Sequence, residues 1–381
     1  MADFVYLDNN ATTRVDERVI EALLPFYRER WGNPSSSHRF GAQLVADIDH
    51  ARAYVAAAIN ARPDEIVFMS GGTEADNTAV RGALAAQPGK RHVVISTVEH
   101  HALIDLAKAL EAEGVAVTRV GVDGAGRLNL DELDRAIRPD TAVVSLMLAN
   151  NETGVIFPIR EAAKVAARHG AIVHTDAVNA LGKTPIDVRE LGVAMLSLSG
   201  HKIYAPKGVG ALYIRGGAPF RSMMLGGHQE RDRRGGTQNV AGIVALGRAC
   251  ELITESAIAH NAHILRLRER LERDLSACFP QVVIAGQDAA RLPNTTCACF
   301  RDVEAQAILL MLSESGICVS SGAACASGAV TPSHVLTAMG LPAEVASSQI
   351  RFSLGRYSTD ADLDRLFAVL PDVVRRAAAV A

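Results

Sequence analysis

The sequence predicts an α/β protein with a large domain, built on a mostly parallel sheet with helices on both faces, and a smaller α/β domain. Two observations predict this fold. Across residues 48–255, short apolar runs alternate with segments whose apolar residues recur at helical spacing, which is the βαβ rhythm. The chain has 381 residues, 49% of them hydrophobic, which is enough to build about two domains.

The apolar runs of the large domain are predicted to be its strands. They cover residues 92–96, 142–148, 171–174, 195–198 and 209–214. Parallel sheets of this kind bind ligands at the carboxyl ends of their strands. Polar residues directly after each run are therefore the candidates for a functional site.

The smaller domain is predicted to start with an amphipathic helix over residues 257–277, after a stretch of mixed polarity at residues 254–256. Further strands are expected at residues 282–284, 295–300 and 317–320, and helices at residues 303–312 and from Asp360. We therefore expect residues 16–255 to form the large domain, and residues 1–15 and 256–381 to form the small domain.

The near-balance of acidic and basic residues gives no electrostatic attraction toward nucleic acid or an anionic membrane. Lys and Arg number 39 against 42 Asp and Glu, a formal charge of −3. No apolar run approaches the ~20 residues that span a bilayer, and the first residues lack a basic region followed by an apolar stretch. The sequence therefore predicts a cytoplasmic protein whose ligand is a small molecule or another protein.

The six cysteines are too few and too irregularly spaced for a disulfide framework, which favours a reducing compartment. No CxxC pair occurs. Cys297 and Cys299 alternate in a predicted strand, so we interpret them as core residues and expect no metal site. Cys250 and Cys278 lie in helical patterns and are likewise interpreted as buried thiols.

Lys202 follows directly on the apolar run that ends at Leu198. A lysine that is deprotonated by a desolvated, cation-rich pocket can bind the aldehyde of pyridoxal phosphate (PLP). Taken alone, Lys202 would be read as a surface lysine in a turn. Asp176 changes that balance, because it follows another predicted strand and PLP withdraws electrons only while a carboxylate keeps its ring nitrogen protonated.

Further polar residues follow the other strands. Gly72 and Thr73 open a predicted helix, where free N–H groups and the helix dipole favour a phosphate. His100 is placed to stack on the pyridine ring, and Asn151 offers an amide to the phenolic oxygen. Each alone is more often an ordinary loop residue, but together, at successive strand ends, they indicate a cofactor site.

These residues resemble the fold-type I PLP enzymes, and specifically the cysteine desulfurases of the nitrogen-fixation (NifS-like) and housekeeping iron–sulfur-assembly (IscS-like) kind. The resemblance covers nearly the whole chain. Besides the segments above, it rests on LDNNATT from Leu7, GNPSS from Gly32, GGHQE from Gly226, RGGT from Arg234 and RFSLGR from Arg351.

The resemblance implies a role for each site residue. Lys202 carries PLP, Asp176 pairs with its ring nitrogen, and His100 stacks on the ring. Arg351 binds the substrate carboxylate, for which a bidentate guanidinium is suited, with Asn33 as a further substrate-binding candidate. The remaining cofactor-binding residues are Gly72, Thr73, Asn151, Asn179, Ser199, Gly200, His201 and Thr237. Thr237 would reach the phosphate of a neighbouring subunit, which implies a homodimer.

Cys325 lies in a run of small residues, 320–329, that buries little apolar area and should leave the loop free to move. A small buried cysteine would be the ordinary interpretation of an isolated loop thiol. Beside a PLP site, we expect Lys202 or His100 to move protons while the Cys325 thiolate attacks the sulfur of L-cysteine. The products are L-alanine and an enzyme persulfide, whose sulfur goes to an iron–sulfur scaffold or another acceptor protein, with the nitrogen-fixation type favoured.

Three positions depart from the family pattern: Asn179 replaces the usual glutamine, Gln238 the glutamate of the nitrogen-fixation type, and Ala323 the usual serine of the cysteine loop. The alternative activity is that of a selenocysteine lyase or cysteine sulfinate desulfinase, which can work without a persulfide-forming thiol. Two further candidates are an aminotransferase and a non-catalytic protein that binds PLP or serves as an assembly scaffold.

Overall fold

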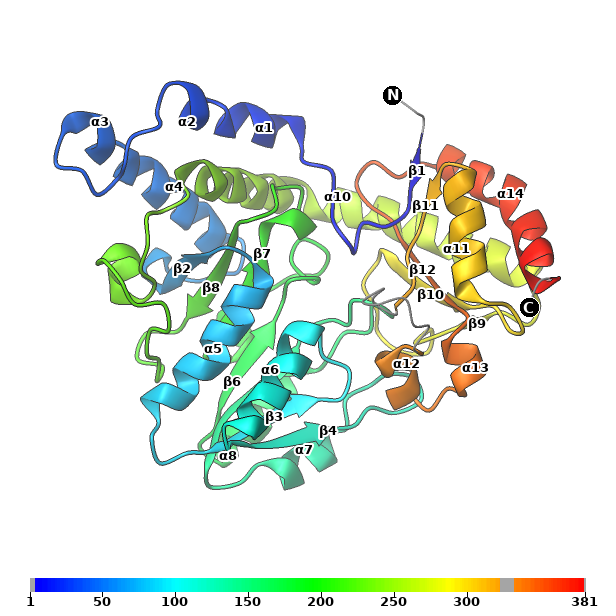
Figure 1. The fold of residues 1–381 in the computed structure, drawn as a ribbon, viewed down its shortest axis with the longest axis horizontal. Helices are drawn as coiled ribbons and strands as arrows, with labels where there is room; N and C mark the ends of the chain where they lie inside the picture. Colours follow the sequence, from blue (N-terminus) through cyan, green and yellow to red (C-terminus); the bar gives the residue numbers. More distant parts are fainter. Residues whose placement is uncertain (1–3, 323–331, 380–381) are drawn as a thin grey trace.

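The computed structural model describes residues 4–322 and 332–379, and Cys325 lies outside them. Figure 1 shows a larger and a smaller lobe joined by one long helix. None of the helices in the described residues has the length and apolarity that crossing a membrane requires.

The larger lobe is built on a sheet that is mostly parallel, as predicted. Strand β8 is antiparallel to both of its neighbours, and the other pairings are parallel. In order across the sheet, its seven strands in the described residues are β2 (Ile66–Met69), β8 (Gly210–Ile214), β7 (Met195–Ser199), β6 (Ile172–Asp176), β5 (Thr141–Met147), β3 (His92–Ser96) and β4 (Ala116–Val120).

Helices cover both faces of this sheet, because successive side chains of its strands point to opposite sides and both sets are apolar. Val67 and Met69 pack with α5 (Gly72–Ala86) and α6 (His101–Ala112). Ile66 and Phe68 belong to the core on the other face. That face is covered by α4 (Leu44–Ala57), α8 (Ile159–Arg168) and the first part of α10 (Val240–Cys278).

The smaller lobe has a separate core between short strands, two helices of its own and the second part of α10. Strands β9 (Val283–Ile284), β10 (Thr295–Cys299) and β12 (Gln349–Ser353) form an antiparallel sheet, and β1 (Val5–Tyr6) pairs in parallel with β11 (Ile317–Cys318). The covering helices are α11 (Ala305–Glu314) and α14 (Asp360–Ala378). Shorter elements are α1 (Glu17–Leu23), α2 (Pro25–Arg28), α3 (Arg39–Ala42), α7 (Leu130–Ala136), α9 (Val188–Leu191), α12 (His334–Ala338), α13 (Ala343–Ala346) and the 3₁₀ turns η1 (Pro63–Glu65), η2 (Gly200–Lys202) and η3 (Gln229–Asp232).

The runs predicted as strands all form strands, with ends within two residues of the prediction. The predicted interruption at residues 254–256 is wrong, because α10 continues through it. Thr254 and Ser256 donate their hydroxyls to the carbonyls of Cys250 and Leu252 one turn earlier, so the helix accommodates both polar residues. Cys278 is also not buried as predicted, because it is exposed at the last position of α10.

Helix α10 passes from one core to the other. Leu246 and Ile253 pack in the core of the larger lobe, whereas Leu267 and Leu275 pack in that of the smaller lobe. The change of core falls near the predicted domain boundary at residues 255–256, and the division itself stays a prediction.

Candidate active site

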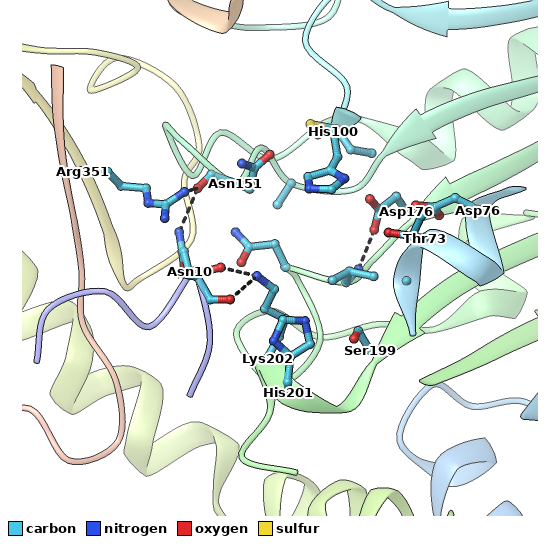
Figure 2. A pocket seen from close by; sticks show the side chains of 16 residues that line it. Asn10, Thr73, Asp76, His100, Asn151, Asp176, Ser199, His201, Lys202 and Arg351 are labelled. Carbon is cyan, nitrogen blue, oxygen red and sulfur yellow. Dashed lines mark hydrogen bonds between the residues drawn. The ribbon is translucent and has the colours of Figure 1, made fainter. Parts of the chain in front are cut away.

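A cavity with a volume of about 400 Å³ lies at the carboxyl ends of β5, β6 and β7. Figure 2 shows His100 and Lys202 on opposite sides of it, with Asp176 near one end and Arg351 near the other. The predicted site residues that line this cavity are Gly72, Thr73, His100, Asn151, Asp176, Asn179, Ser199, His201, Lys202 and Arg351.

Three predicted residues of the described part do not line the cavity. Gly200 is buried in η2, where an added Cβ would lie 3.1 Å from side-chain atoms of Ala205 and Val209, so it shapes the turn that carries Lys202. Thr237 and Asn33 are exposed on the surface. The role predicted for Thr237 concerns a neighbouring subunit, and Asn33 Oδ1 accepts a hydrogen bond from the backbone N–H of Ser35 (2.9 Å).

Lys202 extends from η2, directly after β7. Its ammonium donates to the backbone carbonyl oxygens of Asn10 and Ala11, the second at 2.9 Å. Burial, and then the positive charge of Arg351, lower the pKa of Lys202 to about 8. A neutral amine is therefore accessible close to neutral pH.

Two buried carboxyl groups face the cavity near the same end. Asp176 ends β6, its Oδ1 accepts the N–H of Val178 (2.8 Å), and burial raises its pKa to about 6. Asp76 projects from α5, and burial and the neighbouring Asp176 raise its pKa well above the usual value. Nε2 of His174 lies 3.6 Å from Asp76, but burial lowers the pKa of this histidine to about 3 and leaves it uncharged. This end of the cavity therefore favours a cationic ligand group.

The N-terminus of α5 faces the same cavity through Gly72 and Thr73. Its N-cap residue, Gly71, makes no side-chain capping bond, so the first N–H groups of a 15-residue helix remain available to an anion. An added Cβ on Gly72 would lie 2.7 Å from Cγ2 of Val178, which explains the glycine. The residue types present here suit a phosphate.

His100 caps the N-terminus of α6, and its Nδ1 accepts the N–H of Ala102 (3.1 Å). Desolvation, and then the charge of Lys202, lower its pKa to about 4. The ring is therefore neutral at pH 7. Because Nδ1 is an acceptor in this bond, the single proton lies on Nε2.

Arg351 lies on β12 of the smaller lobe and is 6% exposed. It donates to the backbone oxygen of Asn151 (3.2 Å) and to Oδ1 of Asp8 (3.0 Å). Its buried Nε–H has no hydrogen-bond partner among the described residues. The guanidinium is thus held in place with donor capacity left for a carboxylate.

The prediction missed two polar residues of the cavity wall, Asn10 and Asp76. Asn10 lies within the LDNNATT motif, and its carbonyl is one of those that bind Lys202. Asp76 lies one turn after Thr73, between the buried Ala75 and Ala79. An aspartate on the apolar face of a helix is the signal that would have identified it.

Buried polar atoms without hydrogen-bond partners in the described part of the chain indicate what kind of ligand the cavity can bind. They include Oδ1 of Asp76, Nδ2 of Asn179 and Nε of Arg351, and all three residues line this one cavity. An unpaired buried polar atom is costly, so such a set indicates a polar ligand. The arrangement offers an amine nucleophile, a carboxylate for a cationic ring nitrogen, an anion site and a guanidinium.

The aminotransferase class-V family matches residues 5–366 of the chain. The sequence is 52% identical over 375 residues to a cysteine desulfurase of Trichormus azollae, covering 98% of this chain and 93% of that protein. The solved structure of a NifS-like protein superposes with a TM-score of 0.92 at 36% identity, covering 98% of this chain and 100% of the other. A structure described as SspA in complex with cysteine gives a TM-score of 0.81 at 33% identity, over 93% and 99% of the two chains.

Proposed function

Because this chain belongs to the aminotransferase class-V family, we propose that it is a PLP-dependent cysteine desulfurase that converts L-cysteine to L-alanine and transfers the sulfur to Cys325. One observation carries the proposal beyond the family. A single cavity brings together Lys202, the carboxyl group of Asp176, the N-terminus of α5 and the guanidinium of Arg351.

The residues present fit PLP. Lys202 would hold it covalently, Asp176 would face its ring nitrogen, and Gly72 and Thr73 would bind its phosphate. Ser199 and His201 line the cavity beside them, and Asn151 and Asn179 offer amides for the phenolic oxygen. When bound, PLP supplies an electron sink for the bonds of the substrate's α-carbon.

Substrate orientation falls to Arg351, whose guanidinium suits the carboxylate of L-cysteine. A solved relative is described as a complex with cysteine, which supports this substrate. Asp8 already accepts one bond from Arg351, so the substrate carboxylate would share the guanidinium with it. Asn33 stays a prediction as a second substrate-binding residue.

Proton transfer falls to two groups on opposite sides of the cavity. The neutral amine of Lys202, with a pKa of about 8, can take up a proton from the substrate. His100 carries its proton on Nε2 and can donate it. The two groups therefore divide the acid and base roles.

Sulfur transfer requires a thiolate, and we assign it to Cys325. The bond between Cβ and sulfur of the substrate breaks while a sulfur–sulfur bond forms on Cys325, and the carbon keeps the electron pair and takes a proton. A second cavity supports an approach from the cysteine loop. Its volume is about 520 Å³, it shares His100, Asn151 and Arg351 with the first, and it includes Gly322, the last described residue before Cys325.

The proposal extends to a cytoplasmic homodimer in which Thr237 binds the phosphate of the neighbouring subunit. Exposed aromatic side chains support a subunit contact, since such groups are unfavourable in water. They are Tyr27, Trp31, Phe40 and Tyr54, with exposed fractions of 65%, 69%, 37% and 42%. An iron–sulfur scaffold, of the nitrogen-fixation type in our proposal, would receive the sulfur.

The test compares three forms of the purified protein supplied with L-cysteine and a thiol reductant. The natural enzyme should bind PLP with a visible absorption band and release equal amounts of alanine and sulfide. Lys202→Ala should lose the band and at least ~100-fold of the activity. Cys325→Ala should keep the band and lose persulfide formation.

The outcomes separate the candidate activities. Sulfide release by Cys325→Ala at the natural rate would contradict the persulfide route and favour a selenocysteine lyase or cysteine sulfinate desulfinase. A keto-acid product in place of alanine would indicate an aminotransferase. A visible band without any alanine would indicate a non-catalytic PLP-binding protein.

A further inference from the structure

Asn179 has one end of its amide engaged and the other end free. The side chain is 5% exposed and lines the cavity. Its Nδ2 has no hydrogen-bond partner within the described residues. Since a buried NH₂ group without a partner is costly, this donor indicates an acceptor that a ligand would bring.

The engaged end is bound by Lys183. The ammonium of Lys183 donates to the backbone oxygen of Asn179 (2.8 Å) and to its Oδ1 (3.3 Å). An ammonium has donors only, so it can bind the amide oxygen but not the NH₂ group. The two ends of an amide have nearly the same shape, and here the neighbouring charge selects which one faces Lys183.

Lys183 has no carboxylate partner in the described part of the molecule. Its side chain lines a third, smaller cavity beside Lys202, lined also by Tyr204 and by Ile253 of α10. Burial, and then the charges of Lys202 and Arg351, lower the pKa of Lys183 to about 7. Desolvation of the Lys183 ammonium is unfavourable, so a lysine at this position indicates a role beyond packing.

We propose that Lys183 is a positioning residue that turns the Asn179 amide so that its NH₂ group donates to the phenolic oxygen of PLP. The inference rests on the proposed function, since it assumes that PLP occupies the cavity. A donor is required there, because the phenolic oxygen of bound PLP carries negative charge. The side chain of Asn179 is short, and Lys183 is the residue that binds its amide oxygen and so sets its direction.

The experiment measures the pH midpoint of the visible absorption of bound PLP, together with its dissociation constant. Lys183→Met should raise the midpoint by about one pH unit, because the phenolic oxygen loses a hydrogen bond that stabilises its negative charge. PLP should bind roughly 10-fold more weakly. Lys183→Arg, which keeps the charge and the donors, should stay closer to the natural protein. Lys90→Met is the matched control, because Lys90 also donates to a backbone carbonyl, that of Gly170 (2.8 Å).

A double-mutant cycle separates positioning from a direct effect of charge. In an Asn179→Ala background, Lys183→Met should produce no further shift of the midpoint. A full shift in that background would overturn the proposal, since Lys183 would then act without the amide. An unchanged midpoint in the single variant Lys183→Met would overturn it as well.

If Lys183→Met does not fold, a further variant still tests whether Asn179 presents a donor to the cavity. Asn179→Asp retains the pairing with Lys183 but presents an anionic oxygen to the cavity, so it should raise the midpoint more than Asn179→Ala does. A smaller shift than that of Asn179→Ala would contradict a donor at this position. These results are distinct from a failure of the proposed function, in which the natural protein itself would not bind PLP or release alanine.

Discussion

Lys202 is subject to opposing influences from the residues around it. Burial and the charge of Arg351 favour the neutral amine, whereas Asp176 and Asp8 favour the ammonium. The result is a pKa of about 8, below the usual value of about 10.4 for lysine. Since only the neutral amine attacks an aldehyde, the proposed function implies that this residue sets the pH range in which the protein takes up PLP.

We therefore predict that the rate of PLP uptake by the apoprotein rises with pH and levels off above a midpoint near 8. The sign follows from the lowered pKa, because the amine is neutral above it and charged below it. Stopped-flow absorption at several pH values measures the rate. Arg351→Met should move the midpoint upward, because it removes a positive charge that disfavours the ammonium. A rate that still rises steeply between about pH 9 and 10.4 would contradict the prediction.

The position of a residue relative to the predicted strands decides whether the sequence could predict it as part of the site. Lys202 and Asp176 follow apolar strands of a predicted parallel sheet, so the geometry of the fold brings them together. Asp76 and Lys183 carry no such signal, because one projects from within a helix and the other from a loop after β6. For Asp76 the only sequence signal is its place on the apolar face of a helix, whereas the contact of Lys183 with Asn179 is visible only in the packed structure.

At the scale of elements, the anion site depends on how closely the start of α5 approaches the loop after β6. Gly72 is the contact point, 2.7 Å from Val178 if a Cβ is added. Glu74, in the same turn, pairs with Arg234 (2.9 Å), which ties the RGGT segment to this helix. The turn that would hold the phosphate is thus fixed from two sides.

Gly72→Ala is predicted to weaken PLP binding about 10-fold to 100-fold, since overpacking of a tight contact typically costs about 1–3 kcal/mol and displaces the N–H groups. Gly89→Ala is the matched control, because a Cβ at Gly89 meets nothing within 4 Å. Equilibrium titration of the apoproteins, followed by the visible band, gives both dissociation constants. Equal affinities for the two variants would show that the approach of α5 is not limiting.

Helix α10 shows where prediction from polarity fails at this scale. Polar residues at 254–256 suggested a boundary, but polar residues alone do not end a helix, and no glycine or proline stands there. The long helix was predictable in its two halves, through Leu246 in one core and Leu267 in the other. The continuity of the helix was not predictable, because the polarity of neighbouring residues does not show in which core each helical turn is packed.

At the scale of the whole molecule, the N-terminal segment connects the two lobes at the candidate active site. It pairs with β11 through β1 in the smaller lobe and then crosses to the turn of Lys202, where Thr13 donates its N–H to His201 O (2.9 Å). Figure 1 shows this crossing in blue between the two lobes. Asn10 stands in the middle of it and is 1% exposed.

The Asn10 side chain joins three parts of the chain. Its Nδ2 donates to Asn151 O (3.1 Å) and to Thr295 Oγ1 (2.8 Å), and its Oδ1 accepts from Asn294 Nδ2 (2.9 Å). Asn151 lines the cavity, whereas Asn294 and Thr295 lie at the start of β10 in the smaller lobe. Removal of the amide would leave their polar groups without this partner.

We predict that Asn10→Ala lowers the free energy of unfolding by about 2–4 kcal/mol, because three hydrogen bonds of a buried side chain are lost and each contributes about 0.5–1.5 kcal/mol. The variant should also bind PLP more weakly, since the carbonyls of Asn10 and Ala11 position Lys202. Urea unfolding followed by circular dichroism gives the first quantity and titration with PLP the second.

Gln43→Ala removes one surface hydrogen bond, that of Gln43 Nε2 to Phe40 O (3.1 Å), and serves as the control. It should change the free energy of unfolding by less than about 0.5 kcal/mol. If Asn10→Ala loses no more stability than Gln43→Ala, the lobes are held together without this amide. In that case the contact of the smaller lobe with α10 would hold the lobes together. Weaker PLP binding by Asn10→Ala would then reflect only a change in the position of Lys202.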